Sequence, residues 1–319
     1  MKMNLGKSEI QVSKVIMGLW QAGKRYWVGV KDREVIAAIK HAQDCGISTF
    51  DTAEEYGDGY SEQILGKAIE SRNEVVLLTK VFSNHLKKEQ VQAACEASLK
   101  NLKTDYIDLY QIHWPSGSWG SKIVPVAETL EAMTLLKEQG KIRAIGVSNF
   151  SLAQLKEATE FAQIDSIQPP YSLLWRNIEK EIVPFCIENK ISILAYSPLA
   201  QGFLTGKFAA SHQFEKGDNR VANKLFSSEV FSCVVEAVEK LKPIADRKKI
   251  TLAQLALAWV FSHKNTAAIA GARNKKQSIE NAEAMEVTLT KDEIQEIENA
   301  TWPVASNFFD DAIPWYWNP

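Results

Sequence analysis

The sequence predicts a (β/α)8 barrel, the TIM barrel, with a short N-terminal β-hairpin and extra helices. Eight β-rich runs occur along the chain, and amphipathic helical patterns lie between most of them. This alternation is typical of βαβ units in a parallel sheet. The runs are almost continuously apolar, as in Val75–Leu78, which indicates strands that are covered on both faces. Eight units in 319 residues fit a barrel of about 250 residues with insertions, so we expect one domain over residues 1–319.

The strands are expected where β-branched, aliphatic and aromatic residues cluster between turn residues. They cover residues 15–20, 48–51, 75–81, 106–112, 143–147, 165–168, 191–196 and 266–270. The hairpin is expected over residues 3–12, because Gly6, Lys7 and Ser8 form a turn between two short alternating segments. We expect this hairpin to close the bottom of the barrel.

The helices are expected where apolar residues recur with the helical period. The clearest patterns cover residues 32–45, 61–71, 88–102, 129–139, 151–161 and 180–189. Residues that favour helix ends stand at several of these boundaries. We expect N-caps at Asp32, Ser61, Ser151 and Thr251, and C-terminal caps at Gly46 and Gly140.

Composition and charge argue against several classes of protein. Hydrophobic residues make up 45% and charged residues 24%, and the net charge is −2 without a dense basic run. Neither nucleic acid nor a membrane surface is therefore an expected partner. The N-terminal residues lack the apolar core of a signal peptide, and no apolar run is long enough to span a bilayer. The four cysteines are widely spaced, which is typical of reduced thiols in a cytoplasmic protein: Cys45, Cys95, Cys186 and Cys233.

A two-domain, doubly wound enzyme is the competing architecture. It needs a Gly-x-Gly-x-x-Gly turn between an early strand and its helix. The best match is Gly57-Asp58-Gly59, but the third glycine is missing, since Tyr60, Ser61 and Glu62 follow. A dinucleotide site of the Rossmann type is therefore disfavoured.

Four polar residues stand at or just after the ends of successive strands. Asp51, Lys80 and His113 occupy strand ends, and Tyr56 lies in the loop after the first of these. Considered alone, Asp51 could be a loop cap and His113 a structural histidine. Lys80 follows an apolar strand and needs a buried partner, which Asp51 could supply. Because active-site groups of a barrel gather at the carboxyl ends of its strands, all four together predict a proton-transfer site.

The sequence resembles the aldo-keto reductase family along nearly its whole length. Residues 51–62 (DTAEEYGDGYSE) are similar to the first family signature, residues 146–150 (GVSNF) to the second and residues 196–199 (YSPL) to the third. The end of the chain resembles the adenosine-binding region of the family at Gly271, Ala272, Arg273, Gln277, Glu280 and Asn281. The resemblance implies reduction of aldehydes and ketones to alcohols by hydride transfer from NADPH, with NADH the less favoured cofactor.

The resemblance also implies a catalytic tetrad of Asp51, Tyr56, Lys80 and His113. Hydride addition leaves negative charge on the carbonyl oxygen, and Tyr56 is expected to protonate it. A free tyrosine has a pKa near 10, and we expect the ammonium of Lys80 to lower it. Asp51 would balance the charge of Lys80, and His113 would orient the carbonyl. Each preorganised donor is worth about 3 kcal/mol of barrier.

The cofactor is expected to lie across the carboxyl ends of the strands. Ser148, Asn149 and Gln168 resemble the groups that hold the nicotinamide carboxamide, with loop capping as the alternative role. Tyr196 resembles the aromatic residue that stacks on the nicotinamide, with core packing as the alternative. Lys207 resembles a pyrophosphate ligand, although a lone lysine is more often a surface residue. The remaining cofactor residues implied by the resemblance are Gly18, Trp20, Ser197, Leu199, Gln201, Gly202, Gly271, Arg273, Gln277, Glu280 and Asn281.

The preference for NADPH depends on residues 271–278. Arg273 and Lys275 precede a helix expected to begin near Gln277, and a helix N-terminus favours a phosphate. No acidic residue stands between Gly271 and Ser278 to repel a 2′-phosphate. One departure is Gln277, where many family members carry an arginine. The long segment 198–230 contains the pyrophosphate residues, and we expect it to become ordered when the cofactor binds.

Aromatic residues near the strand ends predict an apolar substrate pocket. They are Trp20, Tyr26, Trp27, Phe82 and Trp114. Such a pocket would accept apolar or aromatic aldehydes, small molecules that carry a carbonyl. Residues 308–317 are also rich in aromatics, and either the pocket, the core or a dimer contact accounts for them. A monomer is the default expectation.

Two other functions remain open at this point. Potassium-channel β-subunits resemble the same family and act chiefly as cofactor-sensing binding partners, which need a large docking face. A metal-dependent barrel hydrolase needs several ligands at the strand ends. His113 is the one histidine expected at a strand end, whereas His41, His85, His212 and His263 fall on helices or loops, so no metal is expected.

Overall fold

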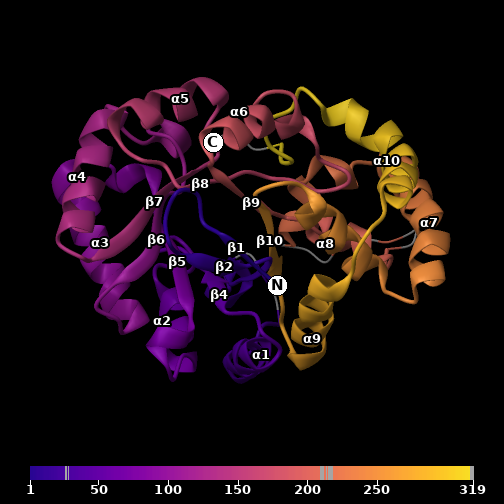
Figure 1. Ribbon diagram of the computed structural model, residues 1–319, viewed down its shortest axis with the longest axis horizontal. Helices are drawn as coiled ribbons and strands as arrows, with labels where there is room; N and C mark the ends of the chain where they lie inside the picture. Colours follow the sequence, from indigo (N-terminus) through magenta and orange to yellow (C-terminus); the bar gives the residue numbers. More distant parts are fainter. Residues whose placement is uncertain (26, 28, 209–211, 213, 215–217, 317–319) are drawn as a thin grey trace.

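The computed structural model describes residues 1–25, 27, 29–208, 212, 214 and 218–316. Its centre is a closed barrel of eight parallel strands in the order β10-β3-β4-β5-β6-β7-β8-β9 (Figure 1). The strands are β3 (Val15–Gly18), β4 (Thr49–Asp51), β5 (Val76–Val81), β6 (Ile107–Ile112), β7 (Ile142–Ser148), β8 (Ser166–Gln168), β9 (Ser192–Tyr196) and β10 (Thr266–Gly271). The predicted (β/α)8 barrel is confirmed, and each strand lies within two residues of its expected bounds.

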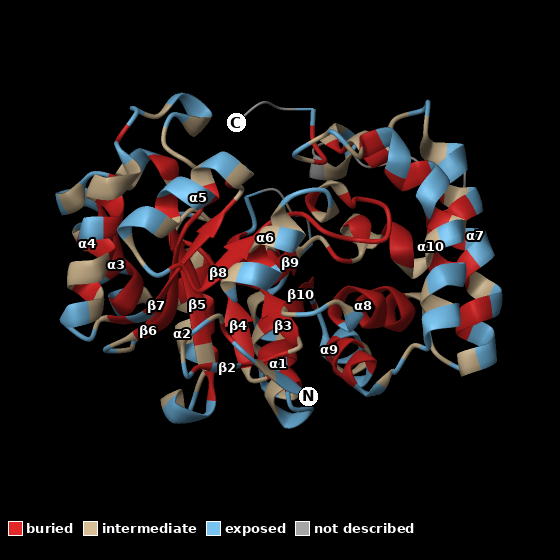
Figure 2. Ribbon diagram, turned by 45° about the horizontal axis from the view of Figure 1, so that its top comes forward, coloured by how far each residue is buried: buried red, intermediate tan, exposed pale blue. Residues whose placement is uncertain are grey.

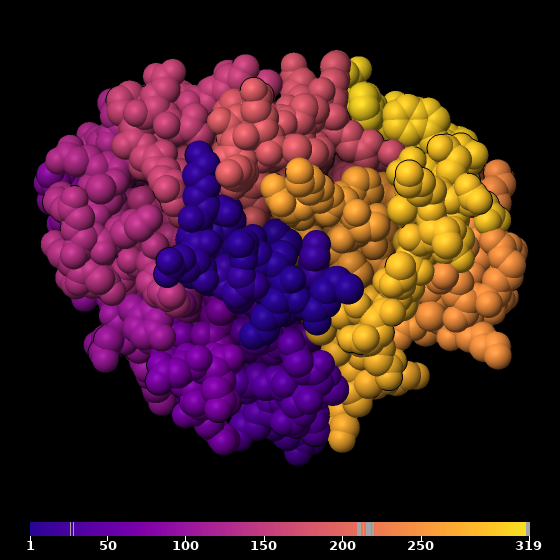
Figure 3. Space-filling model, in the orientation of Figure 1, coloured from indigo at the N-terminus to yellow at the C-terminus, as the bar shows by residue number. Residues whose placement is uncertain are grey.

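The N-terminal hairpin closes one end of the barrel, as predicted. Strands β1 (Lys2–Asn4) and β2 (Gln11–Ser13) pair antiparallel. In Figure 3 these first residues, in indigo, cover the centre of the face in view. The turn presses closely on the barrel: Gly6 has a φ of +57°, and a Cβ there would lie 2.3 Å from the carbonyl oxygen of Asp165. Leu5, Ile10 and Val12 of the hairpin join the apolar filling of the barrel.

The helices surround the barrel and bury their inward faces, whereas their outward faces are exposed (Figure 2). Helices α7 and α10 pack against each other outside α8 (Figures 1 and 2). The helices are α1 (Asp32–Asp44), α2 (Tyr60–Ala68), α3 (Lys88–Leu102), α4 (Val126–Glu138), α5 (Leu152–Phe161), α6 (Ile182–Asn189), α7 (Phe231–Lys248), α8 (Leu252–Ser262), α9 (Lys275–Glu283) and α10 (Lys291–Ala305). None of the helices in the described ranges is long and apolar enough to cross a bilayer.

Two of the predicted N-caps are confirmed. Ser151 and Thr251 each accept a hydrogen bond from the backbone N–H three residues later, in capping boxes completed by a glutamine. Gly46 and Gly140 follow α1 and α4 with φ values of +87° and +74°, as C-terminal caps require. At these four helix ends, a side chain or a residue with left-handed backbone conformation satisfies backbone N–H or C=O groups that have no hydrogen-bond partner within the helix.

Two predicted N-caps are wrong. The N-cap of α1 is Lys31, and Asp32 is its first residue, with its carboxylate 2.6 Å from Lys24 Nζ. Helix α2 begins at Tyr60, so Ser61 lies within it and its hydroxyl donates to the carbonyl of Leu19 at 2.8 Å. In both cases the side chain that the local sequence assigned to the cap is bound instead by a partner outside the helix. Helix α9 begins at Lys275, two residues before its expected start.

The segment 198–230 is described only in part. Residues 209–211, 213 and 215–217 lie outside the described residues, so the expected ordering of this segment by cofactor stays a prediction. The part that is described contains short 3-10 helices at Ala200–Thr205, Asn219–Ala222 and Lys224–Phe226. These turns lie at the mouth of the barrel, where several of their residues line a cavity.

Candidate active site

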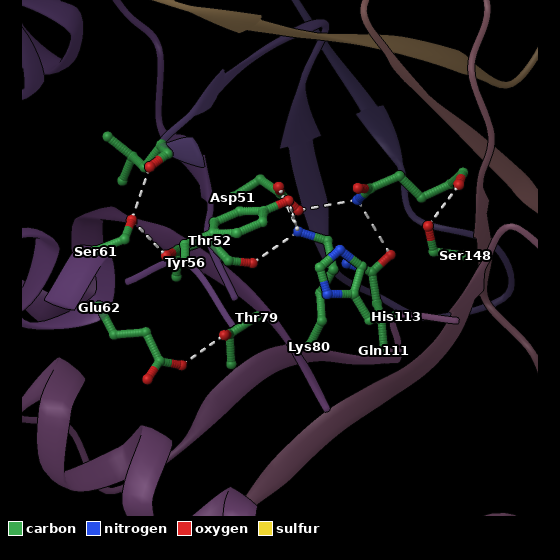
Figure 4. A network of polar contacts seen from close by, with 12 residues as sticks. Asp51, Thr52, Tyr56, Ser61, Glu62, Thr79, Lys80, Gln111, His113 and Ser148 are labelled. Carbon is green, nitrogen blue, oxygen red and sulfur yellow. Dashed lines mark hydrogen bonds and ion pairs between the residues drawn. The ribbon is translucent and has the colours of Figure 1, made fainter. Parts of the chain in front are cut away.

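The four predicted catalytic residues meet at the carboxyl end of the barrel. The ammonium of Lys80 lies 2.7 Å from Asp51 Oδ1, 2.7 Å from the carbonyl oxygen of Thr52 and 3.3 Å from the hydroxyl of Tyr56 (Figure 4). Strand register explains the contact, because Asp51 pairs with Leu78 on β5, two residues before Lys80. The imidazole of His113 lies edge-on to the Tyr56 ring, with ring centroids 5.5 Å apart. The local sequence and the barrel together place an acid, a base and two hydrogen-bonding rings at one point.

A network of side-chain amides continues from Asp51 across the barrel. Gln168 Nε2 donates to Asp51 Oδ2 at 2.9 Å and lies 3.4 Å from Gln111 Oε1. Ser148 Oγ donates to the Gln168 carbonyl at 2.7 Å (Figure 4). Both oxygens of Asp51 are therefore bonded, one to a cation and one to an amide. This arrangement stabilises a buried carboxylate.

The residues predicted to hold the nicotinamide end adjoin this network. Asn149 Nδ2 donates to the carbonyl of His113 at 3.1 Å and to Ser148 Oγ at 3.0 Å. Its Oδ1 accepts from the hydroxyl of Tyr196 at 2.9 Å. Asn149 has a φ of +60°, a conformation that asparagine tolerates better than most residues. The side chains that could hold a carboxamide are thus fixed in place by one another.

The pKa values of the tetrad are dominated by burial. Burial first, and the negative charge of Asp51 second, raise the pKa of Tyr56 above its usual value. Burial lowers the pKa of Lys80, and the Asp51 carboxylate opposes this shift. The ordinary tyrosine pKa is about 10, so Tyr56 keeps its proton at neutral pH. We expected Lys80 to lower the pKa of Tyr56, but in this structure desolvation of the phenol prevails and Lys80 is paired more closely with Asp51.

His113 is a neutral imidazole. Burial first, and the positive charge of Lys80 second, lower its pKa well below the usual value. Its side-chain Nδ1 is buried and has no hydrogen-bond partner among the described residues. A neutral imidazole donates through one ring nitrogen and accepts through the other. The ring can therefore bind a carbonyl oxygen without carrying a charge.

The wild type is expected to become less stable as the pH falls below about 6.5, and the variant His113→Gln should lack the part of this decrease that comes from His113. Below about pH 6.5 the unfolded chain protonates this histidine and the folded protein does not, so the unfolded state binds more protons. The free energy of unfolding of the wild type should then fall by about 1.4 kcal/mol per pH unit, until the folded pKa is reached.

Urea unfolding of both proteins from pH 7 to pH 5 measures this slope. The variant His85→Gln, whose side chain is 46% exposed in the wild type, is the control for loss of a surface histidine. From pH 7 to pH 5 the free energy of unfolding should fall more steeply for the wild type than for His113→Gln. Parallel pH profiles for the two proteins would contradict the neutral state assigned to His113.

A cavity of about 590 Å³ extends from the tetrad along the barrel mouth. Its size is typical of small-molecule and cofactor sites. Most of the predicted cofactor residues line it: Gly18, Trp20, Ser148, Asn149, Gln168, Tyr196, Ser197, Leu199, Gln201, Gly202, Lys207, Gly271, Arg273 and Gln277. The predicted substrate residues Trp20, Trp27, Phe82 and Trp114 line it too, whereas Tyr26 lies outside the described residues.

Two predicted cofactor residues do not line this cavity. Asn281 is buried on α9, and its Nδ2 donates to the carbonyl of Gly271 at 3.2 Å. Glu280 accepts through its backbone carbonyl from Gln254 Nε2 at 3.3 Å. In this structure Asn281 connects α9 to the end of β10, and Glu280 connects α9 to α8.

Three cations of the cavity lining lie close to one another, namely Lys207, Arg220 and Arg273. Burial first, and the neighbouring arginines second, lower the pKa of Lys207. Asp218 Oδ1 accepts from Arg220 Nε at 2.8 Å, so one carboxylate faces three cations. Gly202 has a φ of +103°, and a Cβ there would lie 2.9 Å from Lys207 Nζ. The absence of a side chain at Gly202 lets Lys207 approach the backbone closely, and the excess positive charge of the three cations favours binding of an anion.

The helix N-terminus beside Arg273 differs from the prediction. The backbone N–H of Arg273 donates to Gln277 Oε1 at 2.8 Å, and that of Gln277 donates to Asn274 Oδ1 at 3.1 Å. These backbone donors are therefore already bonded within the chain. The guanidinium of Arg273 lies over the Trp27 ring, 4.8 Å from its centroid, which puts Trp27 at the cationic end of the cavity. Lys275 is exposed and does not line the cavity.

Comparison with known proteins identifies the family. The sequence profile of the Aldo/keto reductase family matches residues 14–301. The chain belongs to this family. Membership makes this aldo/keto reductase an oxidoreductase that acts on small carbonyl compounds. Among the described residues, no group of three or more His, Cys, Asp or Glu side chains could hold a metal ion.

Two relatives of this aldo/keto reductase extend over nearly its whole length. The aldo-keto reductase YhdN of Bacillus subtilis is 36% identical, with 97% of this chain and 95% of the relative covered. The NADH-specific methylglyoxal reductase of Escherichia coli is 34% identical, with 91% and 94% covered. Relatives at this level of identity therefore include an enzyme whose name specifies NADH.

Solved structures of similar proteins agree with the fold of this aldo/keto reductase. The glycerol dehydrogenase AKR11B4 of Gluconobacter oxydans has a TM-score of 0.87 at 30% identity, covering 99% of this chain and 98% of that one. An aldo/keto reductase of Klebsiella pneumoniae, solved with NADP and acetate, has a TM-score of 0.76 at 31% identity, covering 93% and 94%.

The sequence did not single out every residue that lines the cavity of this aldo/keto reductase. Arg220, Trp119 and Trp315 line it and were not assigned to a site, and Gln21 was also missed. Arg220 was a cation within the long segment 198–230, which could have suggested a phosphate ligand. Trp315 belonged to the aromatic C-terminal residues, whose position depends on how distant segments pack.

Proposed function

We propose that this protein reduces aldehydes and ketones to alcohols with NADPH, using Asp51, Tyr56, Lys80 and His113 in a single barrel domain of residues 1–319. One observation carries the proposal. The buried ammonium of Lys80 lies within hydrogen-bond distance of both the Asp51 carboxylate and the Tyr56 hydroxyl, and these two residues line the cavity. A rate assay of NADPH oxidation with a panel of aldehydes, ketones and sugars tests it.

The residues of the cavity fit a nicotinamide dinucleotide. Ser148, Asn149 and Gln168 present amide and hydroxyl groups to the nicotinamide end, and Tyr196 presents an aromatic ring. The Nε2 of Gln201 is buried without a partner among the described residues, so it can donate to a ligand oxygen. When bound, the cofactor would supply the hydride that adds to the carbonyl carbon.

The chain itself supplies the proton and the orientation. The protonated Tyr56 hydroxyl donates to the carbonyl oxygen of the substrate and transfers its proton as charge develops there. The neutral ring of His113 donates a second hydrogen bond to the same oxygen. Lys80 lies 3.3 Å from the Tyr56 hydroxyl and stabilises the phenolate that remains, while Asp51 holds the ammonium in place.

The substrate end of the cavity is aromatic. Phe82 lies edge-on to His113 with centroids 5.6 Å apart, and Trp114 lies edge-on to Trp119 at 5.6 Å. These rings, together with Trp20, favour an apolar or aromatic aldehyde whose carbonyl reaches Tyr56.

We place the enzyme in the cytoplasm because its four cysteines are free, with a monomer as the default state.

NADPH is the proposed cofactor rather than NADH. Lys207, Arg220 and Arg273 provide more positive charge than the single Asp218 balances, which favours the additional 2′-phosphate. The Klebsiella pneumoniae enzyme was solved with NADP, which supports this preference. Against it stand the Escherichia coli relative named for NADH and the neutral Gln277. Arg273 is the residue on which the assignment depends.

The variant Arg273→Ala is expected to weaken NADPH binding by about tenfold to a hundredfold, because one charge-assisted hydrogen bond contributes about 1.5–3 kcal/mol. The dissociation constant for NADH should change by less than about twofold, since NADH lacks the 2′-phosphate. Fluorescence titration with both cofactors measures the difference. Lys275→Ala is the matched control, because Lys275 is exposed outside the cavity. Equal losses for NADPH and NADH would remove Arg273 from the phosphate site.

A further inference from the structure

The C-terminal residues cover the aromatic ring on which the nicotinamide would stack. The indole of Trp315 lies nearly parallel to the ring of Tyr196, with centroids 5.9 Å apart and an interplanar angle of 18°. It lies edge-on to Trp20, with centroids 6.3 Å apart. Trp315 is only 5% exposed, and all three rings line the same cavity. The face of Tyr196 that Trp315 covers is therefore on the cavity side.

A short β-bridge holds Trp315 in this position. Asn223 and Trp315 are bridge partners, with the backbone N–H of Lys224 donating to the carbonyl of Pro314 at 2.8 Å. The ammonium of Lys224 lies 2.8 Å from an Asp311 carboxylate oxygen. Trp315 also lines a second hollow, of about 520 Å³. Trp315 thus borders two hollows, and backbone hydrogen bonds on either side of it connect it to one short segment.

The bridge also connects Trp315 to the proposed pyrophosphate residues. Asn223 is 1% exposed, and its Nδ2 donates to Gln201 Oε1 at 3.2 Å. Its Oδ1 accepts from the backbone N–H of Leu225 at 2.9 Å and so caps the following turn. The buried side chain of Asn223 therefore bonds to Gln201, which is expected beside the cofactor, while the backbone of Asn223 pairs with Trp315.

We propose that Trp315 competes with the nicotinamide ring for Tyr196, so that residues 310–316 act as an autoinhibitory gate on the nicotinamide end of the site. The proposal rests on the proposed function, because it takes Tyr196 as the stacking partner of the nicotinamide. Parallel aromatic rings on one face exclude each other, since each needs the same contact area. Binding of the whole cofactor then requires the indole to withdraw, whereas binding of the adenosine phosphate end alone does not.

The test compares the whole cofactor with a fragment that lacks the nicotinamide. Dissociation constants for NADPH and for adenosine 2′,5′-bisphosphate are measured for the wild type, Trp315→Leu and Asn223→Ser. Leucine removes the competing ring. Serine can still cap the turn but cannot reach Gln201. Both variants are expected to bind NADPH about two- to tenfold more tightly, with the affinity for the fragment unchanged. Tyr316→Ser is the control, because Tyr316 is adjacent and 61% exposed.

Each outcome of this test is informative. Tighter NADPH binding in both variants, with no change for the fragment or in the control, supports the gate. Unchanged or weaker NADPH binding in Trp315→Leu overturns it, because the indole would then be neutral or part of the nicotinamide site. If wild type and variants bind neither ligand, the proposed function itself fails. Thermal unfolding of each variant confirms that the comparison is between folded proteins.

Discussion

Replacement of Tyr56 by phenylalanine is expected to lower kcat for an aldehyde substrate by about 10²–10⁴-fold, because general acid catalysis contributes a factor of that size. Lys80 does not line the cavity, whereas the Tyr56 phenol holds a proton at neutral pH and lines the cavity, where a substrate carbonyl can reach it. Its pKa is raised by burial and by Asp51, so it does not ionise before the carbonyl arrives. Phenylalanine keeps the ring and removes only this proton.

Cofactor affinity should change by less than about twofold in the same variant. The groups proposed for the nicotinamide end are Ser148, Asn149, Gln168 and Tyr196, and their hydrogen bonds go to residues other than Tyr56. Stopped-flow turnover and fluorescence titration measure the two effects separately. Tyr60→Phe is the matched control, since its hydroxyl is bonded to Asp32 at the outer surface. A near-native kcat in Tyr56→Phe would show that another group donates the proton.

The barrel and the meeting of the four tetrad residues at one end of it were predictable, because both depend on local sequence. Apolar runs that stop at a polar residue define the strands, and the closed parallel sheet brings their carboxyl ends together. The sequence alone therefore places Asp51, Lys80 and His113 at strand ends. The strand register then fixes the 2.7 Å approach of Lys80 to Asp51.

The rest of the site depends on contacts between distant segments, which no local pattern specifies. Ser61 has the sequence of a cap but bonds to Leu19, which comes from another strand end. Trp315 reaches Tyr196 only because its backbone pairs with Asn223, 92 residues earlier in the chain. The raised pKa of Tyr56 has the same origin, since burial by the whole barrel exceeds the effect of one adjacent lysine.

The variant Lys80→Met is expected to lose both turnover and stability. Methionine has nearly the same length as the lysine stem and carries no charge, so the phenolate left by Tyr56 loses its stabilising cation. Loss of kcat by about 10²–10³-fold is expected from removal of one preorganised charge. Asp51 is 2% exposed and would retain only its bond to Gln168. Leaving a buried charge unpaired costs about 3–5 kcal/mol, which urea unfolding would measure.

The double variant Asp51→Asn, Lys80→Met separates the two effects. Removing both charges leaves no unpaired ion in the barrel, so most of the lost stability should return, because a buried pair contributes little net stability. Turnover should stay low, since the Tyr56 hydroxyl still lacks the ammonium 3.3 Å away. A double variant that recovered kcat together with stability would contradict this, because the Lys80–Asp51 pair would then serve only to hold the fold. Recovery of stability without turnover would assign to Lys80 the stabilisation of charge on Tyr56.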